Sequence, residues 1–377
     1  MTGAERDRPL RVLFVNEGEL GTEVLGHAAA EQMVRRRLAA TELVDARFVN
    51  LPPLRGLPHL ATRSFPLLRA IDLDLQPTRW HLVQSLRARR LVARELEAFP
   101  ADALHVQSHA VSFALVREMR RRPTFLSFDV SVTDWRLMGI WRPVRRHSAA
   151  VMASSRALER RVLAEAALVL AWTDWARAAA ERVCPAARVE EYHPGIDLDL
   201  FRPGERSERS AVRVLFVGGR FAAKGGNDLL RALEGSLGTT VELDLVTPED
   251  VPVRPGVRVH RLRVGDPRLV ELYRQADVFC LPTHGDAAPL ALVEAMACGC
   301  AVVSTSVGGI PELLGDGTAG VVVVPGDVPR LAQVLEGLIR DPARRAALGH
   351  AARARCEERY DAVRQTVRLV DLIRSRV

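Results

Sequence analysis

Residues 278–304 read VFCLPTHGDAAPLALVEAMACGCAVVS. The stretch begins with a short apolar run, Val278 to Leu281, and ends with a second run, Ala301 to Ser304. Between them lies a stretch of helical composition, Leu290 to Cys298. Two apolar runs joined by a helix are typical of a βαβ unit, in which parallel strands are buried on both faces. The stretch therefore predicts an α/β fold with a parallel sheet.

The same alternation fills the first half of the chain. Apolar runs that predict strands alternate with amphipathic stretches that predict helices, which favours a parallel sheet with helices on both faces. The expected strands are 10–15, 43–49, 103–106, 124–128, 168–171 and 188–192, and the expected helices are about 26–40, 78–99, 111–120, 148–165 and 174–183.

A segment rich in Pro, Gly and charge, from His193 to about residue 210, interrupts the alternation, which then restarts. We therefore expect two doubly wound domains facing a cleft: residues 1–193, and residues 194–357. The C-terminal stretch, residues 358–377, is expected to pack back on the first domain as a helix. Expected strands of the second domain are 212–217, 241–246, 257–260, 278–281, 301–304 and 320–324, with helices near 228–234, 269–275, 290–298 and 328–339.

Composition describes a soluble globular protein of 377 residues, with 48% hydrophobic and 26% charged residues. No stretch approaches the ~20 apolar residues that span a bilayer, and the charged N-terminus leads directly into a strand, unlike a signal peptide. We therefore expect a cytoplasmic protein. The five cysteines are odd in number and lack C-x-x-C spacing, so reduced thiols are expected and no metal site is predicted.

Positive charge is concentrated in the first half. Residues 1–195 hold 29 Arg against 22 Asp and Glu, whereas residues 196–377 hold 24 basic and 24 acidic residues. The whole net charge of +7 therefore lies in the first half. Such a bias attracts anionic partners at long range, and nucleic acid, an acidic membrane surface and a phosphorylated acceptor all remain open. Solvated arginine-rich helix faces are an equally weighted explanation.

A second informative stretch is 218-GGRFAAKGG-226, which contains Lys224, the only lysine in the chain. It follows an expected strand and precedes an expected helix, so its backbone amides and the helix N-terminus can face an anion. Lys224 adds a mobile point charge and Arg220 a planar fork, a combination suited to a diphosphate. Chance survival of one surface lysine is the alternative.

Two carboxylates accompany this cationic loop. Asp286 follows the strand that ends near Leu281, and Glu294 lies on the next helix. Both are therefore expected at the strand end where Arg220 and Lys224 lie. Ionised carboxylates only accept hydrogen bonds, so they suit the hydroxyls of a ribose and a sugar.

These motifs strongly resemble those of glycosyltransferase family 4, which has the GT-B fold. The family's E-x7-E signature corresponds to the stretch from Asp286 through Glu294 and on to Val303 at the same spacing, and its G-R-x-x-x-K-G motif to Gly219 through Gly225. Further matches are LYRQADVFCLP at 272–282, GGIPELL at 308–314 and the linker PGIDLDLFRP at 194–203.

The resemblance implies a retaining hexosyltransferase that uses a nucleotide-diphosphate sugar and no obligatory metal. Arg220 and Lys224 would neutralise the leaving diphosphate, Glu294 would hold the ribose, and Asp286 would contact the donor sugar near the reacting centre. Gly219 and Leu290 would also line the donor site, and Gly21, in a loose match to the family's N-terminal glycine loop, would approach the sugar. The first domain would bind the acceptor, which is a glycan, a lipid or a small molecule.

The sequence departs from the family pattern in two places. Asp286 is one methylene shorter than the usual Glu, and Ala287-Ala288 replaces Gly-Phe. After the expected strand 124–128 the sequence reads Ser-Phe-Asp-Val where many members have a His. His105 and His109, on the preceding strand and its loop, are assigned no role.

Three other functions are alternatives to a glycosyltransferase. A non-catalytic protein that binds sugar nucleotides would explain both departures. A nicotinamide oxidoreductase is weaker because no G-x-G-x-x-G follows the first strand, and a specific nucleic-acid binder is weaker still because no reading motif accompanies the basic patches. The helix that carries Arg79, Arg87, Arg89, Arg90 and Arg94 beside Trp80, Leu82, Leu86 and Leu91 is a candidate for peripheral contact with anionic lipid.

Overall fold

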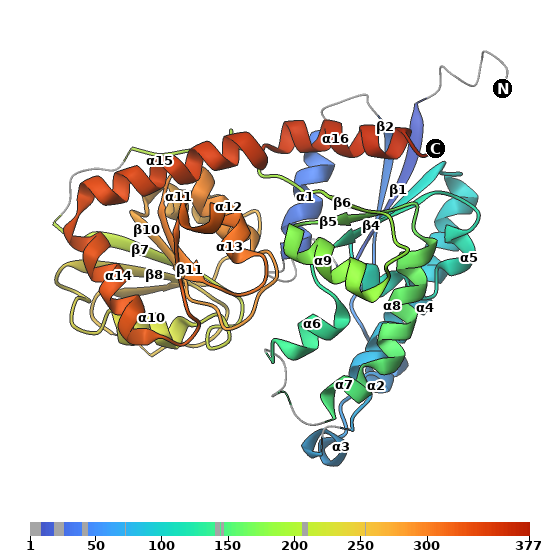
Figure 1. Cartoon of the computed structure of the whole chain (residues 1–377), viewed down its shortest axis with the longest axis horizontal. Helices are drawn as coiled ribbons and strands as arrows, with labels where there is room; N and C mark the ends of the chain where they lie inside the picture. The colour runs from blue at the N-terminus through green and yellow to red at the C-terminus, as the bar shows by residue number, and fades with distance from the viewer. Residues whose placement is uncertain are drawn as a thin grey trace. The chain divides into compact units, whose positions relative to one another are not determined.

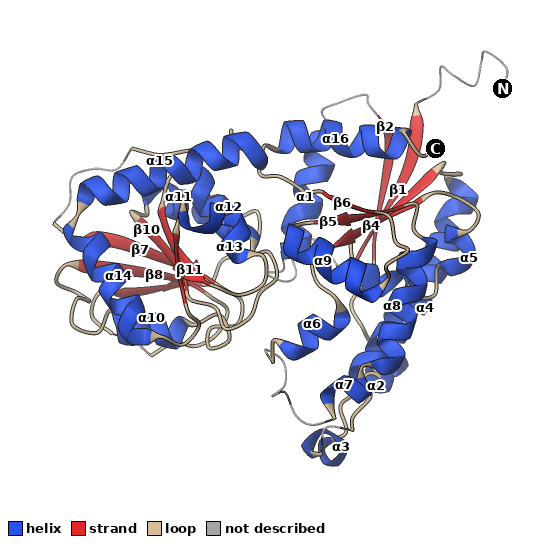
Figure 2. Cartoon of the chain, in the orientation of Figure 1, coloured by secondary structure: helices blue, strands red, loops and turns tan. Residues whose placement is uncertain are grey.

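The protein is described here by a computed structural model, in which residues 9–18, 26–39, 44–71, 73–139, 144, 147–205, 210–252 and 254–377 are described. The chain forms two compact units (Figure 1). The first contains Met1–Leu20, Glu31–Pro194 and Val363–Val377, and the second contains Gly21–Ala30 and Gly195–Ala362. Each unit is built on one six-stranded sheet (Figure 2).

The sheet of the first unit is parallel throughout, with strand order β2-β1-β3-β4-β5-β6. Its strands are β1 (Leu10–Asn16), β2 (Val44–Asn50), β3 (Ala103–Val106), β4 (Thr124–Phe128), β5 (Leu168–Ala171) and β6 (Val189–Glu191). Its helices are α1 (Gly26–Ala39), α2 (Gly56–Ala61), α3 (Pro66–Ala70), α4 (Gln76–Ala98), the 3₁₀ turn η2 (His109–Ser112), α5 (Val116–Met119), α6 (Val132–Leu137), α7 (Ser148–Val151), α8 (Ala153–Glu165), α9 (Asp174–Val183) and α16 (Ala362–Arg374).

Two apolar clusters form the core of the first unit. Side chains that alternate along β1 belong to one cluster or to the other. Leu13 and Val15 of β1 belong to a cluster with residues of α4, α8 and α9. Val12 and Phe14, which alternate with them, belong to a second cluster with residues of α1 and α16. Because successive strand residues point to opposite faces, the sheet is covered by helices on both sides. The C-terminal helix α16 is therefore part of the first unit, as the fold prediction required.

The sheet of the second unit is also parallel, with order β12-β11-β10-β7-β8-β9. Its strands are β7 (Val212–Val217), β8 (Val241–Val246), β9 (Val257–His260), β10 (Val278–Leu281), β11 (Ala301–Thr305) and β12 (Val321–Val323). Its helices are α10 (Gly226–Ala232), α11 (Pro267–Gln275), α12 (Leu290–Ala297), α13 (Ile310–Leu313), the 3₁₀ turn η3 (Gly315–Gly317), α14 (Val328–Arg340) and α15 (Pro342–Arg359). The residues of β10 and β11 are fully buried, as parallel strands covered on both faces should be.

The linker after the first unit is tied to the break between the last two helices. Ile196 donates its N–H to the Tyr360 carbonyl oxygen at 2.6 Å and accepts from the Ala362 N–H at 3.0 Å. Gly195 has φ +80°, and a Cβ there would lie 2.6 Å from the Ala362 Cα. The C-terminal helices α15 and α16 are therefore separated at the point where the linker pairs with the chain.

Several sequence expectations need correction. The single helix expected over 111–120 is wrong, because η2 and α5 are separate turns with the buried side chains of Phe113 and Leu115 between them. The short helices α2, α3, α6 and α13 were not predicted, and the single helix expected over 148–165 is divided into α7 and α8. A capping signal existed for α6, since the Ser131 hydroxyl accepts from the Asp134 N–H at 2.9 Å and donates to its carboxylate.

Among the described residues, no helix is both long and apolar enough to cross a bilayer. All five cysteines are buried thiols outside any disulfide, which agrees with the expectation of reduced cysteines.

Candidate functional site

The second sheet changes its direction of winding between β7 and β10. The chain runs from β7 outward through β8 to β9, then returns to place β10 on the other side of β7. In open parallel sheets, ligands bind at the carboxyl ends of the two strands that flank such a reversal. The loops that follow β7 and β10 are the two stretches singled out from the sequence, so the fold brings them to one edge.

Glycine is required in the loop that follows β7. Gly225 has φ +79°, and a Cβ on it would lie 1.9 Å from the carbonyl oxygen of Pro282, in the loop after β10. A Cβ on Gly226 would lie 2.2 Å from the Phe221 ring. The loop is closed by hydrogen bonds from the Lys224 N–H to the Arg220 oxygen at 2.9 Å and from the Gly226 N–H to the Phe221 oxygen at 2.8 Å. Gly225 thus lets the two loops touch backbone to backbone, and Gly226 leaves room for the Phe221 ring within the first loop.

Lys224 and Asp286 form an ion pair between these loops, Nζ to Oδ2. Both side chains are largely buried. The other carboxylate oxygen of Asp286 accepts the Ala287 N–H at 3.0 Å. Gly308, with φ +57°, lies so close that a Cβ on it would be 2.2 Å from the Asp286 carbonyl oxygen. The chain therefore holds a carboxylate and its only lysine together at the edge where the winding reverses.

Glu294 lies in the second turn of α12, rather than in a first turn where a helix dipole would account for it. Its Oε2 accepts a hydrogen bond of 2.7 Å from the Tyr273 hydroxyl of α11. Burial raises the pKa of Glu294 to about 7, and the Tyr273 hydrogen bond offsets part of that rise. Burial also raises the pKa of Tyr273 well above its ordinary value, so this hydroxyl remains a donor. A carboxyl group whose pKa lies near 7 is typical of a functional site.

The remaining predicted residues have different environments. Arg220 and Gly219 are half-buried in the loop after β7. Leu290 is the first residue of α12 and is buried. Gly21 lies outside the described residues. Of the predicted set, the structure brings Lys224 and Asp286 into direct contact.

His284 and Asp228 were missed by the sequence reasoning. The His284 Nε2 lies 2.7 Å from the Asp228 Oδ2, at the first turn of α10. The His284 N–H also donates to the Ala223 carbonyl oxygen at 3.0 Å, beside Lys224. This pair is a second tie between the loops after β7 and β10. A histidine two residues before Asp286 was a visible signal, but its partner is 56 positions away in sequence (284 − 228).

In the first unit, the histidines considered from the sequence are internal. His105 of β3 is buried against Phe14, and burial lowers its pKa to about 4. His109 lies 2.8 Å from the buried Glu159 carboxylate, which also accepts the Val132 N–H at 2.9 Å. These contacts tie η2 and α6 to α8, a structural role.

The end of β1 is anchored by a polar network. The Asn50 side-chain amide donates to the Gly18 carbonyl oxygen at 3.0 Å and to Glu31 at 2.6 Å. Arg35 forms an ion pair of 2.9 Å with Glu31. Burial raises the pKa of Glu31, with the hydrogen bond from Asn50 acting against it. The network fixes the first residues of the glycine loop, whose later residues are not described.

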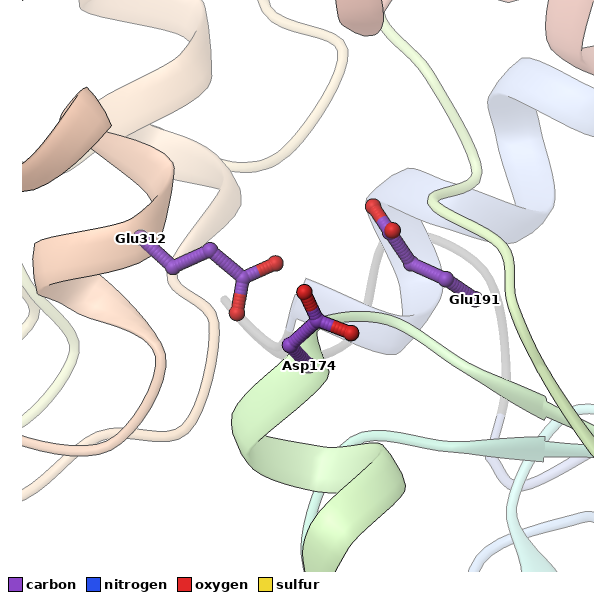
Figure 3. A group of neighbouring side chains, drawn as sticks. All are labelled: Asp174, Glu191 and Glu312. Carbon is purple, nitrogen blue, oxygen red and sulfur yellow. The ribbon is translucent and has the colours of Figure 1, made fainter.

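Three further carboxylates are drawn in Figure 3. Asp174 at the start of α9 and Glu191 at the end of β6 lie in the first unit, at the carboxyl edge of its sheet, while Glu312 lies on α13 of the second unit. Asp174 forms an ion pair of 2.6 Å with Arg177, one turn along α9. Its negative charge is thus matched within its own helix.

Comparison with known proteins finds a family model and several named relatives. The family model Glycosyl transferases group 1 matches residues 257–355. The D-inositol 3-phosphate glycosyltransferase of Mycobacterium avium is 32% identical over 204 residues, which cover 47% of this chain and 48% of that protein. Its counterpart from Acidothermus cellulolyticus is 29% identical over 366 residues, covering 82% and 81%. The chain thus spans about half the length of the mycobacterial relative it matches.

Solved structures match almost the whole chain. Sucrose-phosphate synthase from Thermosynechococcus elongatus has a TM-score of 0.73 at 18% identity, covering 97% of this chain and 98% of that one. HepE of Anabaena, solved in complex with UDP-glucose, has a TM-score of 0.65 at 16% identity, covering 97% and 100%. These likenesses establish the GT-B fold. The model of the group 1 glycosyl transferases thus matches a segment of the second unit, and the solved structures share the GT-B fold with this chain.

Proposed function

We propose that the protein is a retaining glycosyltransferase that moves a hexosyl-type sugar from a nucleotide-diphosphate sugar to an acceptor hydroxyl. The observation that carries the proposal is the Lys224–Asp286 pair, held at the switch point of the second sheet by glycines that tolerate no side chain. A cation and a carboxylate at that edge suit a diphosphate and a sugar hydroxyl that lie side by side.

In this proposal Lys224 and Arg220 stabilise the charge of the departing diphosphate. The bond between the sugar C1 and the diphosphate oxygen breaks, and its electron pair leaves with the phosphate. The acceptor oxygen bonds to C1 on the same face and passes its proton to that phosphate. Two fixed cations would serve without a metal ion, so no obligatory metal is expected.

Glu294 and Asp286 are proposed to orient the donor. Glu294 accepts hydrogen bonds from the ribose hydroxyls and so acts in its ionised form, because a protonated carboxyl loses acceptor capacity. Asp286 contacts the sugar hydroxyls, and Gly219 and Leu290 line the donor site. The role of Gly21 stays a prediction from the resemblance.

The relatives narrow the choice of substrates. One structural neighbour was solved with UDP-glucose and the sequence relatives are named for D-inositol 3-phosphate, so we propose a UDP-hexose donor and an anionic acceptor. An anionic acceptor fits the arginine excess of residues 1–195. We propose that the protein acts in the cytoplasm, with peripheral contact at the inner face of the membrane and no specific nucleic-acid partner.

Thermal unfolding with UDP-glucose and GDP-mannose tests the donor site. A ligand at about 100 times its Kd stabilises by about 2.7 kcal/mol, a shift of roughly 5 to 10 °C for a domain near this size. We expect a shift with one donor that is lost in both Lys224→Ala and Glu294→Ala. Arg340→Ala, which removes an exposed arginine at the end of α14, is the matched control and should keep the shift.

Turnover tests the reaction itself. Release of UDP with D-inositol 3-phosphate as acceptor, measured with and without EDTA, should continue in EDTA. The anomeric proton coupling of the product, read by NMR, should match that of the donor. An inverted product would contradict the retaining assignment, and no donor-induced shift at all would contradict the donor site.

A non-catalytic sugar-nucleotide-binding protein of the same fold is the second candidate. The observation that favours it is the ion pair itself, since the shortened Asp286 is engaged by Lys224 instead of standing ready for a sugar. This candidate predicts a donor-induced shift without hydrolysis of the donor or transfer to any acceptor, and without gain of activity in Asp286→Glu.

A further inference from the structure

The first unit displays a run of exposed apolar side chains on and around two short helices, α2 and α3. Neither α2 nor α3 has a buried residue. Leu57 on α2 and Leu67 on α3 are 79% and 84% exposed. The exposed large apolar residues of this segment, here called the α2–α3 patch, are Leu57, Leu60, Phe65, Leu67, Leu68, Ile71, Leu73 and Leu75. Figure 1 shows α3 at the lower tip of the first unit, away from the strands.

A buried carboxylate fixes the backbone that carries this patch. Asp74 has a fully buried side chain and accepts from the Ser64 hydroxyl at 2.7 Å and from the Phe65 and Gln76 N–H groups at 3.2 and 3.0 Å. It also accepts from Arg79 at 3.0 Å. The loop between α2 and α4 is thus built around an internal hydrogen-bond centre, and its leucines point outward from an ordered scaffold.

Arg79 closes the same scaffold. One of its nitrogens donates to the Arg63 carbonyl oxygen at 2.8 Å, and its guanidinium lies 4.4 Å from the centre of the Phe65 ring. Exposed apolar groups of this number cost solubility, and contiguous patches of this kind mark sites of protein or membrane contact. The scaffold therefore holds an apolar surface that is suited to contact with a protein or a membrane.

The charge around the patch indicates which of these two partners it contacts. Residues 51–71 contain three arginines, Arg55, Arg63 and Arg69, and no Asp or Glu, and all three arginines are exposed. Two copies of the patch facing each other across a two-fold axis would place arginine against arginine. The charged residues of 51–71 are all arginine, and Asp72 follows directly in the sequence; leucine-rich helical turns with this excess of arginine instead match the surface of a bilayer with anionic headgroups.

We propose that the α2–α3 patch is a membrane-docking surface that inserts its leucines into the headgroup region of an anionic lipid bilayer. The proposal changes the element expected from the sequence. On α4, Leu91 packs against the core and Arg79 is bound to Asp74, whereas Leu82 and Leu86 are exposed. Most of the exposed large apolar residues nevertheless lie in the segment before that helix. Lipid binding in this form does not depend on transferase activity.

Co-sedimentation of the full chain with vesicles tests the proposal. Vesicles of equal parts phosphatidylcholine and phosphatidylglycerol should bind the protein, and vesicles of phosphatidylcholine alone should bind it far less. One buried leucine is worth roughly a tenfold change in partition coefficient, so the double variant Leu57→Ser with Leu67→Ser should bind about a hundredfold more weakly. Because both side chains are exposed, this variant should fold normally.

Charge is tested separately. Arg55→Gln and Arg69→Gln should each weaken binding to the anionic vesicles by about fivefold, and added salt should have the same effect. The matched control is Val363→Ser with Val367→Ser, which removes two exposed apolar side chains from α16 and should leave binding unchanged.

Several outcomes would overturn the proposal. They are absence of binding to the anionic vesicles, equal binding to phosphatidylcholine, and equal weakening in the α16 control. A concentration-dependent dimer in sedimentation velocity that the leucine double variant abolishes would instead assign the patch to a second copy. UDP-glucose-induced stabilisation is measured on every variant, so loss of the donor site and loss of lipid binding are read independently.

Discussion

Replacement of Glu294 by Gln should stabilise the second unit while it removes donor binding. Burial raises the pKa of Glu294 from 4.5 to about 7 in the folded protein. Between these values the folded state holds a proton that the unfolded state has released, so stability falls as the pH rises. Above pH 7 the carboxylate is charged in both the folded and the unfolded state, so the full free-energy cost of burying its charge remains. At about 1.4 kcal/mol for each pH unit between 4.5 and 7, that cost is about 3 kcal/mol.

Glutamine keeps the size of the side chain and an oxygen to accept the Tyr273 hydrogen bond, but it carries no charge. At pH 8 we therefore expect Glu294→Gln to be more stable than the native chain by about 3 kcal/mol, and at pH 5 by less than about 1 kcal/mol. The shift induced by the nucleotide sugar should disappear at both pH values, because the amide does not offer two acceptor oxygens to the ribose.

Chemical unfolding measured at pH 5 and pH 8 checks this expectation. All five tryptophans of the chain lie within residues 1–195, so their fluorescence follows the first unit, whereas circular dichroism follows both units. The unfolding transition that circular dichroism detects and tryptophan fluorescence does not is that of the second unit. Its free energy of unfolding is compared between the variant and the native chain. Glu336→Gln, an exposed change on α14, is the control and should show no pH-dependent difference. A gain in stability that is the same at both pH values, or a loss at pH 8, would refute the reasoning.

Three further changes test the site and the patch. Gly225→Ala places a Cβ against the loop after β10 and should destabilise the second unit by more than about 3 kcal/mol in denaturant titration, whereas Gly235→Ala, where no atom lies within 4 Å of the added Cβ, should cost nothing. Asp286→Asn releases Lys224 to a diphosphate, so calorimetry should show UDP binding up to about fivefold tighter while sugar transfer falls; weaker UDP binding would contradict the pairing. Asp74→Asn removes the charge that accepts four donors, so trypsin should cleave between α2 and α4 faster than in the native chain, and an unchanged cleavage rate would show that Asp74 does not fix this loop.

The strands of the second unit were predictable because of how parallel strands are buried. β7, β8, β9 and β10 have the bounds expected from the sequence. Each is a continuous apolar or alternating run that ends at Gly, Pro, Thr or Arg. Burial on both faces leaves little choice of register for β7, β8 and β10, whereas the edge strand β9 has no buried residue. The glycine loop was predictable for a related reason, since only glycine tolerates the positive φ of Gly225 and its approach to Pro282.

Helices without a periodic apolar face were not predictable. α2 and α3 bury no residue, so no stripe of apolar positions distinguishes them from a loop that contains proline. The helix expected over 111–120 failed because tertiary burial of Phe113 and Leu115 divides it into separate turns.

By itself the sequence determined the two α/β units, the strand order along the chain and the residue types in the loop after β7, because apolar runs and glycine geometry can be read locally. Only the tertiary structure decided which charges meet. Lys224 pairs with Asp286, Tyr273 donates to Glu294, and His284 contacts Asp228. The partners are 62, 21 and 56 positions apart in the sequence. Those pairings depend on which strand ends the sheet places side by side, and the desolvation that raises the pKa of Glu294 exists only once α11 and α12 have packed.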